Sequence, residues 1–239
     1  MKIDKLKEAR LHDDIYLRGK PVIKESFKFL FKEILMNQKK FESLIDIGCS
    51  NGAFLSYVNS KSKNKNLYGA DIREDLIKSA KKNCPLATFF NLDISKKIKK
   101  NFKKFDVCVL DGVHTIFDNP EDWLQNFLKF CEKKGAVYIF GSFNPEPYDV
   151  FVRVKNSKSK ILETGFNRPS LETLKRLMMK NNFTFKAKKF DIKINIKKDK
   201  KDPRRTFTIK LKNYKKLTIN GLEQISTKFL VIGKRKEYK

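Results

Sequence analysis

Short apolar runs alternate with amphipathic stretches between residues 43 and 142, and this alternation restricts the fold more than any other feature of the chain. The apolar runs are SLIDIG (43–48), LYGAD (67–71), ATFFNLD (87–93), FDVCVLDG (105–112) and GAVYIFGS (135–142). Between them lie GAFLSYVNS (52–60), REDLIKSAKKN (73–83) and PEDWLQNFLKFCEKK (120–134), whose apolar residues recur at helical spacing. Strands that are apolar along their whole length are buried on both faces, so the pattern predicts a doubly wound, mostly parallel α/β sheet.

The flanking segments add helices and strands of a different kind. Residues 21–37 have helical spacing, and Pro21 suits the first turn of a helix. Residues 169–182 form another predicted helix with Ser170 as its N-cap. Beyond it, apolar residues recur at every second position in FTFKAKKFDIKINI (183–196), RTFTIKL (205–211), KKLTIN (215–220) and TKFLVIGKR (227–235). This period predicts antiparallel strands at the C-terminal end.

Four consecutive predicted strands end in an acidic residue. These residues are Asp46, Asp71, Asp93 and Asp111. In an open α/β sheet, ligands bind at the carboxyl ends of the strands. Carboxylates that are packed together repel one another, so a purely structural sheet has no reason to gather them there. The acids therefore predict a ligand site at this edge.

The first strand also leads into a loop in which Gly48 and Gly52 enclose Cys49, Ser50 and Asn51. Glycines allow a backbone to approach a ligand closely. A carboxylate after the second strand suits a ribose diol, because it can accept two hydrogen bonds. Further acids favour an ammonium, a sulfonium or an exocyclic amine over a pyrophosphate. The predicted ligand is a cationic, hydroxyl-rich nucleoside.

The segment LIDIGCSNG resembles the first motif of the class I, Rossmann-like family of S-adenosylmethionine-dependent methyltransferases, in which an acid stands two residues before the first glycine. The resemblance covers residues 43–142 well and continues more loosely to the C-terminus. It implies a seven-stranded sheet, mostly parallel with antiparallel C-terminal strands, and a small β-hairpin insertion. It also implies S-adenosylmethionine as the cofactor and S-adenosylhomocysteine as the product.

At the methionine end of the cofactor, the resemblance assigns a role to each residue. Asp46 would organise the loop and bind the amino group, while Gly48 and Gly52 would line the site. Asp111 and Gly112 would close the same side.

At the adenosine end, the resemblance implies that Asp71 binds the ribose hydroxyls and that Ile72 lies against the adenine. Asp93 and the backbone of Ile94 would bind the adenine edge. One departure is visible, because Ser50 stands where the family often has a middle glycine. A small residue is tolerated there, so Cys49, Ser50 and Asn51 are also predicted to contact the cofactor. A nicotinamide dinucleotide would instead need G-x-G-x-x-G, which this loop does not supply.

We interpret residues 1–239 as a single domain. An N-terminal lid or helix would occupy residues 1–40, the cofactor-binding core residues 43–142, and the substrate side residues 143–239. A lid of this kind would bring Tyr16 or Arg18 to the cofactor or the substrate.

Methyl transfer to a hydroxyl requires a group that removes its proton. His114 follows the fourth predicted strand directly, and its ordinary pKa suits a general base near neutral pH. The alternative is a histidine that caps the next turn or bonds a backbone carbonyl. Asp111 is the second candidate base.

NPEPY (144–148) is similar to the N-P-P-Y signature of enzymes that methylate amino groups. That signature follows the fourth strand, whereas NPEPY follows the fifth, so we expect a turn there and an oxygen acceptor instead. The predicted substrate side also carries Arg153, Arg168, Arg204 and Arg205, which either bind a phosphate or carboxylate of the substrate or form surface charge.

The chain carries 54 Lys and Arg residues against 27 Asp and Glu residues, a net charge of +27. This charge favours a polyanion partner or reflects a Lys-rich surface from an AT-rich coding sequence. The basic residues are mostly lysines scattered from end to end, whereas nucleic-acid readers prefer Arg. We therefore predict O-methylation of a small acceptor, either anionic or sugar-derived. The alternatives are an rRNA or tRNA methyltransferase and a non-catalytic, basic nucleic-acid-binding protein on the same fold.

The cysteines Cys49, Cys84, Cys108 and Cys131 lie far apart and form no C-x-x-C pair. We therefore expect no metal site and no disulfide framework, and reduced thiols fit a cytoplasmic protein. No apolar run reaches the length of a membrane span, so membrane insertion is not expected. The sequence leaves the oligomeric state open.

Overall fold

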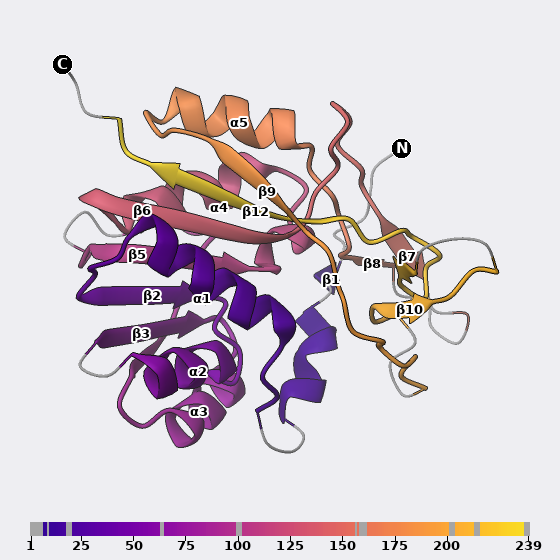
Figure 1. Cartoon of the computed structure of the whole chain (residues 1–239), viewed down its shortest axis with the longest axis horizontal. Helices are drawn as coiled ribbons and strands as arrows, with labels where there is room; N and C mark the ends of the chain where they lie inside the picture. The colour runs from indigo at the N-terminus through magenta and orange to yellow at the C-terminus, as the bar shows by residue number, and fades with distance from the viewer. Residues whose placement is uncertain are drawn as a thin grey trace.

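A seven-stranded sheet forms the centre of the computed structural model, which describes residues 7–8, 10–17, 21–62, 65–98, 102–155, 157, 162–200, 204–212 and 216–236 (Figure 1). The strand order is β4-β3-β2-β5-β6-β12-β9. The parallel strands are β2 (Ser43–Ile47), β3 (Asn66–Asp71), β4 (Thr88–Asn91), β5 (Phe105–Asp111) and β6 (Cys131–Ser142). β12 (Lys228–Lys234) pairs antiparallel with β6 and with β9 (Lys186–Phe190). The sheet confirms the predicted mostly parallel fold with antiparallel C-terminal strands.

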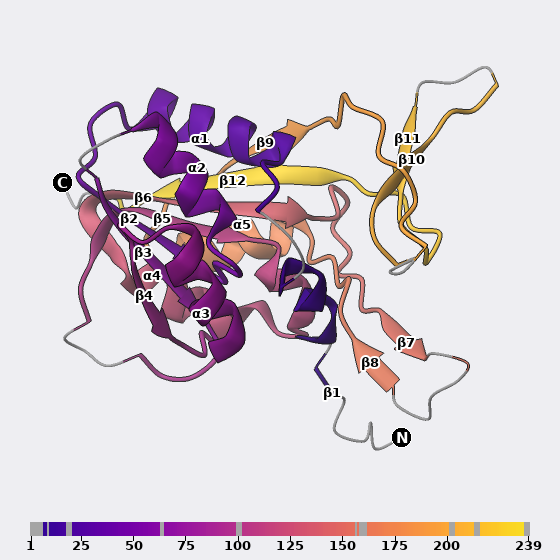
Figure 2. The ribbon, with the colours of Figure 1, turned by 90° about the horizontal axis from the view of Figure 1, so that it is seen from below.

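Helices cover both faces of this sheet (Figures 1 and 2). The helices α1 (Glu25–Asn37), α2 (Ala53–Lys61) and α3 (Glu74–Asn83) pack on one face, and α4 (Pro120–Lys129) and α5 (Leu171–Lys180) pack on the other. Successive residues of β6 alternate between the two cores: Tyr138 belongs to the core that contains Leu30 of α1, while Ile139 belongs to the core that contains Trp123 of α4. This double burial explains why the strands are apolar along their length.

Two predicted helix boundaries are wrong, and each error has a physical cause. The helix predicted over 21–37 begins at Glu25, because Lys24 has an extended backbone (φ −88°, ψ 151°) and residues 21–23 have no regular secondary structure. The helix predicted over 120–134 ends at Lys129, because Cys131 already pairs with Phe105 as part of β6. The register shifts after this pair, and the apolar spacing of the segment therefore belongs to two elements instead of one.

Two hairpins extend past the carboxyl edge of the parallel strands, on the right in Figures 1 and 2. One is formed by β7 (Arg153–Lys155) and β8 (Leu162–Thr164), and β1 (Lys7–Glu8) joins it. The other is formed by β10 (Phe207–Ile209) and β11 (Leu217–Ile219). The 3₁₀ helices η1 (Arg10–Leu17) and η2 (Val113–Ile116) lie at the same edge.

None of the helices within the described residues combines the length and the apolar character that crossing a bilayer requires.

Candidate functional site

A cavity of about 850 Å³ opens at the carboxyl ends of the parallel strands, a volume typical of small-molecule sites. Nearly all of the predicted cofactor residues line it. These are Asp46, Gly48, Cys49, Ser50, Asn51, Asp71, Ile72, Asp93, Ile94, Asp111 and Gly112. The sheet topology therefore brings residues from four different strand ends to one cavity.

The glycine loop turns sharply after β2. The backbone N–H groups of Gly48 and Cys49 both donate to the carbonyl of Ala70, at 2.7 and 3.0 Å. Gly48 and Gly52 have φ of +75°, and Ser50 has φ of +51°. Gly52 does not line the cavity, contrary to its predicted role. It instead starts α2, where an added Cβ would lie 3.1 Å from Cβ of Ala80.

Asp71 joins this loop to the end of β3. Its Oδ2 accepts a hydrogen bond from the Ser50 N–H at 2.9 Å, and its Oδ1 accepts one from the Arg73 N–H at 2.9 Å. Burial raises the pKa of Asp71, and these N–H donors oppose that shift. Because each carboxylate oxygen can accept two hydrogen bonds, both oxygens retain the capacity to accept one from a ligand hydroxyl.

Asp46 is 3% exposed, and burial raises its pKa well above the usual range, with Asp111 and Asp71 adding to the shift. Its Oδ1 has no hydrogen-bond partner among the described residues, and neither does Oγ of Ser50. Buried polar atoms without a partner are costly. The amino group of the predicted cofactor would supply the missing donor beside Asp46, so the residues present fit that group.

Asp93 and Ile94 are fixed at the end of β4. Oδ1 of Asp93 accepts hydrogen bonds from the N–H and the hydroxyl of Ser95, at 3.0 and 2.6 Å. The carbonyl of Ile94 accepts a hydrogen bond from Nδ2 of Asn126 at 2.9 Å. These contacts hold both residues in the cavity wall.

Cys49 also lines the cavity, but burial raises the pKa of its thiol well above the usual value, and Asp46 adds to the shift. A thiol that stays protonated is a weak nucleophile, so Cys49 serves as part of the wall.

His114 is buried beside the cavity and does not line it. Its imidazole is 1% exposed, stacks on Phe143 at 4.3 Å and bonds the Ser142 carbonyl through Nε2 at 3.0 Å. Burial lowers its pKa to about 4. The 3₁₀ turn of η2 thus directs the side chain into the core, which argues against the predicted role of general base. The geometry matches the alternative of a histidine that bonds a backbone carbonyl.

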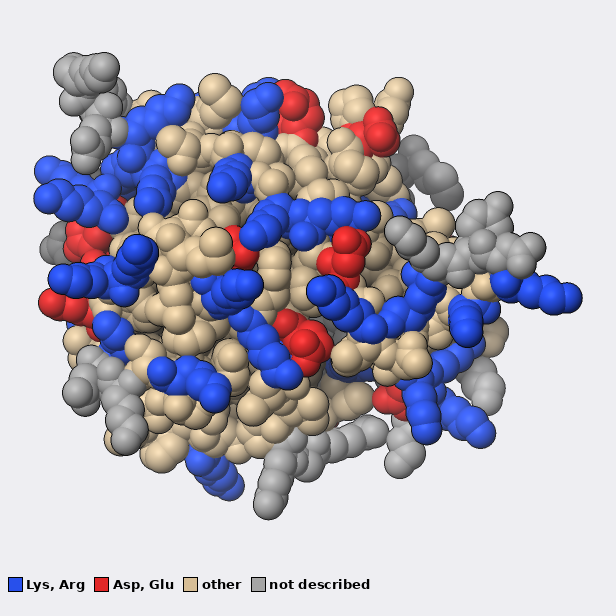
Figure 3. Space-filling model, viewed as in Figure 1, with Lys and Arg blue, Asp and Glu red and all other residues tan. Residues whose placement is uncertain are grey.

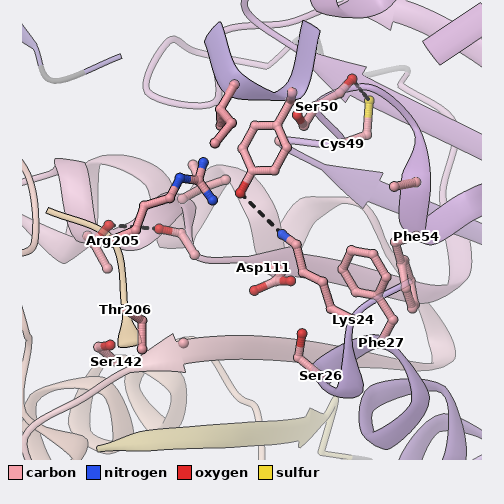
Figure 4. Close-up of a pocket in the computed structure, with 18 of the residues that line it drawn as sticks. Lys24, Ser26, Phe27, Cys49, Ser50, Phe54, Asp111, Ser142, Arg205 and Thr206 are labelled. Carbon is pink, nitrogen blue, oxygen red and sulfur yellow. Dashed lines mark hydrogen bonds between the residues drawn. The ribbon is translucent and has the colours of Figure 1, made fainter. Parts of the chain in front are cut away.

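Tyr16 and Lys24 form a second wall that the strand-end pattern did not reveal. The Lys24 ammonium donates to the Tyr16 hydroxyl at 3.1 Å, and the guanidinium of Arg205 lies 5.0 Å from the centre of the Tyr16 ring (Figure 4). Nδ2 of Asn51 donates to the Tyr16 carbonyl at 2.8 Å and so ties η1 to the glycine loop. Arg18 lies outside the described residues.

Lys228 brings a second ammonium group to this part of the cavity, near Asp111. Burial lowers the pKa of Lys228, and Asp111 opposes the shift. Burial also lowers the pKa of Lys24, but Tyr16 and Asp111 outweigh it and the net shift is upward. Burial raises the pKa of Asp111, while Lys24 and Lys228 oppose that change. One carboxylate therefore lies among two ammonium groups.

The four arginines of the predicted substrate side divide into two pairs. Arg153 pairs with Asp118 and Arg168 donates to a backbone carbonyl, and neither lines the cavity. Arg204 and Arg205 line it, and Arg204 also forms an ion pair with Glu163 at 2.6 Å.

The NPEPY segment forms a turn, in which Nδ2 of Asn144 donates to the Tyr148 carbonyl at 2.8 Å. Asn144 does not line the cavity. The segment therefore lacks the placement that an amino-methylation signature would need.

Comparisons with known proteins identify the family of this chain. A family model described as "Methyltransferase domain" matches residues 20–187. The chain is 28% identical over 142 residues to malonyl-[acyl-carrier protein] O-methyltransferase 2 of Ilyobacter polytropus. This match covers 57% of the chain and 52% of the relative, so the chain spans about half the length of that relative.

Two solved structures share the fold at low identity. A S-adenosylmethionine-dependent methyltransferase from Clostridium acetobutylicum superposes with a TM-score of 0.59 and 13% identity, over 96% of this chain and 98% of that chain. Magnesium protoporphyrin IX methyltransferase from Synechocystis was solved with bound S-adenosylhomocysteine. It superposes with a TM-score of 0.56 and 10% identity, over 95% of this chain and 94% of that chain.

Proposed function

This chain belongs to the class I S-adenosylmethionine-dependent methyltransferases, and we propose that it transfers a methyl group to an oxygen of a small acceptor that is anionic or sugar-derived. One observation carries the proposal. A single cavity joins the acids at the ends of β2 to β5 with the ammonium groups of Lys24 and Lys228. The acids suit the cofactor, and the ammonium groups suit an acceptor that carries negative charge.

In this proposal, S-adenosylmethionine supplies a methyl group activated by its sulfonium. Asp71 accepts hydrogen bonds from the ribose hydroxyls, and Asp93 with Ile94 holds the adenine. Asp46 accepts a hydrogen bond from the amino group of the cofactor through Oδ1, which has no partner among the described residues. The chain contributes by holding donor and acceptor in line, because orientation alone removes a large part of the barrier.

Asp111 lies where the two halves of the cavity meet and is the remaining candidate among the two predicted catalytic residues. We assign it a positioning role, in which its carboxylate holds the ammonium groups of Lys24 and Lys228 toward the acceptor. His114 supports the same wall from behind, because it bonds the carbonyl of Ser142, and Ser142 lines the cavity.

A small acceptor is favoured over a nucleic acid by the distribution of charge. On the face in Figure 3, Lys and Arg side chains are spread widely with acidic side chains among them. A nucleic-acid groove would instead gather basic residues along one track. The relative from Ilyobacter is named as an O-methyltransferase, which supports oxygen as the acceptor atom.

Titration of the purified protein with S-adenosylhomocysteine tests the cofactor assignment. We expect one molecule to bind per chain, and Asp71→Asn to weaken binding about tenfold, because a charged hydrogen-bond acceptor for the ribose is lost. Asp191→Asn is the matched control, since it removes the same charge from an exposed side chain that follows β9 and does not line the cavity. Absence of heat with the wild-type protein, or equal affinity of both variants, would refute the assignment.

A nucleic-acid substrate makes a different prediction. RNA binding through lysines would weaken steeply with added salt. We expect no salt-dependent retention of a mixed tRNA sample on the protein at 50 mM NaCl, measured by filter binding. Tight retention that disappears at higher salt would favour the RNA alternative.

A further inference from the structure

The cavity is poorly equipped to deprotonate an alcohol. No histidine lies among the described residues that line it. Asp46, Asp71 and Asp93 belong to the cofactor half, Glu25 is paired with Lys28 at 2.6 Å, and Asp199 already has an interaction partner. Burial raises the pKa of Asp111 and its two ammonium neighbours oppose that shift, and its carboxylate is already assigned to holding Lys24 and Lys228 toward the acceptor. A hydroxyl acceptor would therefore find no well-placed base.

The same region carries an excess of positive charge. Lys24 is held by the hydroxyl of Tyr16, whereas the Lys228 ammonium forms no hydrogen bond or ion pair within the described residues. Asp111 offsets one of these two charges. The two arginines of the lining have partners of their own, because Arg204 is paired with Glu163, and Arg205 lies over the Tyr16 ring and has a further interaction partner. A half-buried ammonium without a counter-ion is unfavourable, so the arrangement suits one additional monoanion.

An apolar strip leads away from these ammonium groups. After β9 the chain has no regular secondary structure and bends at Ile194, and Phe190, Ile192, Ile194 and Ile196 line the cavity. The β10–β11 hairpin holds this strip from outside. Thr208 exchanges hydrogen bonds with the backbone of Ile196, and the Lys216 ammonium donates to the carbonyl of Ile194 at 2.8 Å. Ile194 is 49% exposed, so the strip reaches the mouth of the cavity.

We infer that the acceptor is a monocarboxylic acid with an apolar chain, whose carboxylate binds at Lys24 and Lys228 and whose chain lies along Phe190, Ile192, Ile194 and Ile196. This inference rests on the proposed function and narrows its substrate class. An acceptor of this kind needs no base, because its oxygen is already ionised at neutral pH.

The transfer then balances without proton movement. A carboxylate oxygen takes the methyl group as the carbon–sulfur bond breaks, and the electron pair of that bond stays on sulfur. The products are a neutral methyl ester and S-adenosylhomocysteine. A phosphate monoester, which carries nearly two negative charges at neutral pH, would leave one charge unmatched.

Binding of octanoate in the presence of saturating S-adenosylhomocysteine tests the inference, by calorimetry on the full chain. We expect octanoate to bind and the uncharged octanamide to bind at least tenfold more weakly. Lys228→Met should weaken octanoate binding about tenfold, while Lys234→Met, on the same strand outside the cavity, should leave it unchanged. Ile194→Asn should weaken it about fivefold, because apolar contact is lost.

Three outcomes would overturn the inference: no octanoate binding at 5 mM, equal affinities for octanoate and octanamide, or equal effects of Lys228→Met and Lys234→Met. The comparison of octanoate with octanamide uses the wild-type protein, so it tests the inference even where a variant folds poorly. Failure of S-adenosylhomocysteine itself to bind would count against the proposed function, and this first titration separates the two failures.

Discussion

Replacing Gly48 with alanine is expected to lower the free energy of unfolding by about 3 kcal/mol. Two effects add at this position. Gly48 has φ of +75°, which is unfavourable for any residue with a Cβ, and the new Cβ would lie 2.0 Å from Cγ2 of Val113. Val113 is β-branched and its short side chain cannot turn aside freely, so the loop or η2 must move.

Gly112→Ala is the matched control for this prediction. Gly112 has φ of +77°, but a Cβ there would meet no atom within 4 Å. Gly112→Ala should therefore lower the free energy of unfolding by only about 1 kcal/mol, because the unfavourable backbone conformation is its only cost. Adding Val113→Ala to Gly48→Ala should recover much of the difference, because it removes the clashing methyl group. Urea unfolding followed by the fluorescence of Trp123 measures all four proteins, and equal losses for Gly48→Ala and Gly112→Ala would contradict the steric argument.

The same substitution connects the fold to the ligand. Gly48 and Cys49 donate to Ala70, and the Ser50 N–H that follows donates to Asp71. A loop displaced at Gly48 therefore also displaces the carboxylate proposed to bind the ribose. We expect Gly48→Ala to lose more affinity for S-adenosylhomocysteine than Asp71→Asn does.

The cofactor half of the cavity could be predicted because it follows from topology. Parallel strands end at one edge, so residues such as Asp71 and Asp111 that follow successive apolar runs must lie near one another. This prediction requires no knowledge of individual side-chain contacts. The direction of a side chain is a different matter, since His114 also follows a strand directly. The 3₁₀ turn after Gly112 sends its imidazole between Trp123 and Phe143, which the apolar spacing does not encode.

Tyr16, Arg204 and Arg205 are candidates from the sequence and line the cavity, whereas Lys24 and Lys228 were not predicted because they do not follow parallel strands. Lys228 is the first residue of β12, and an antiparallel strand brings its beginning, not its end, to the cavity. The predicted antiparallel strand over residues 227–235 therefore contains this signal. Lys24 lies in a segment predicted to be helical, and Tyr16 is predicted to reach the site only as part of an N-terminal lid. Their contacts with each other form only in the folded chain, so no local pattern marks them.

His114 should make the stability of this protein fall as the pH is lowered from 6.5 toward 4. Burial lowers the pKa of the folded imidazole to about 4, whereas the unfolded chain binds this proton near pH 6.5. Between these values the unfolded state binds more protons, so the free energy of unfolding decreases as the pH falls. The stability that the lowered pKa of His114 provides is fully present above pH 6.5, and about 3 kcal/mol of the free energy of unfolding is lost by pH 4.

The non-titrating variant His114→Gln isolates this effect, because its amide can still donate to the Ser142 carbonyl. Asp46, Asp71 and Asp111 have raised pKa values and act in the opposite sense, but they are present in both proteins and are removed by subtraction. Urea unfolding at pH 7.5 and pH 5 should show the wild-type protein losing about 2 kcal/mol more than the variant. Equal losses would mean that the imidazole titrates normally in the folded protein. It would then have access to solvent and regain its candidacy as a base, so this measurement also decides between the two roles of His114.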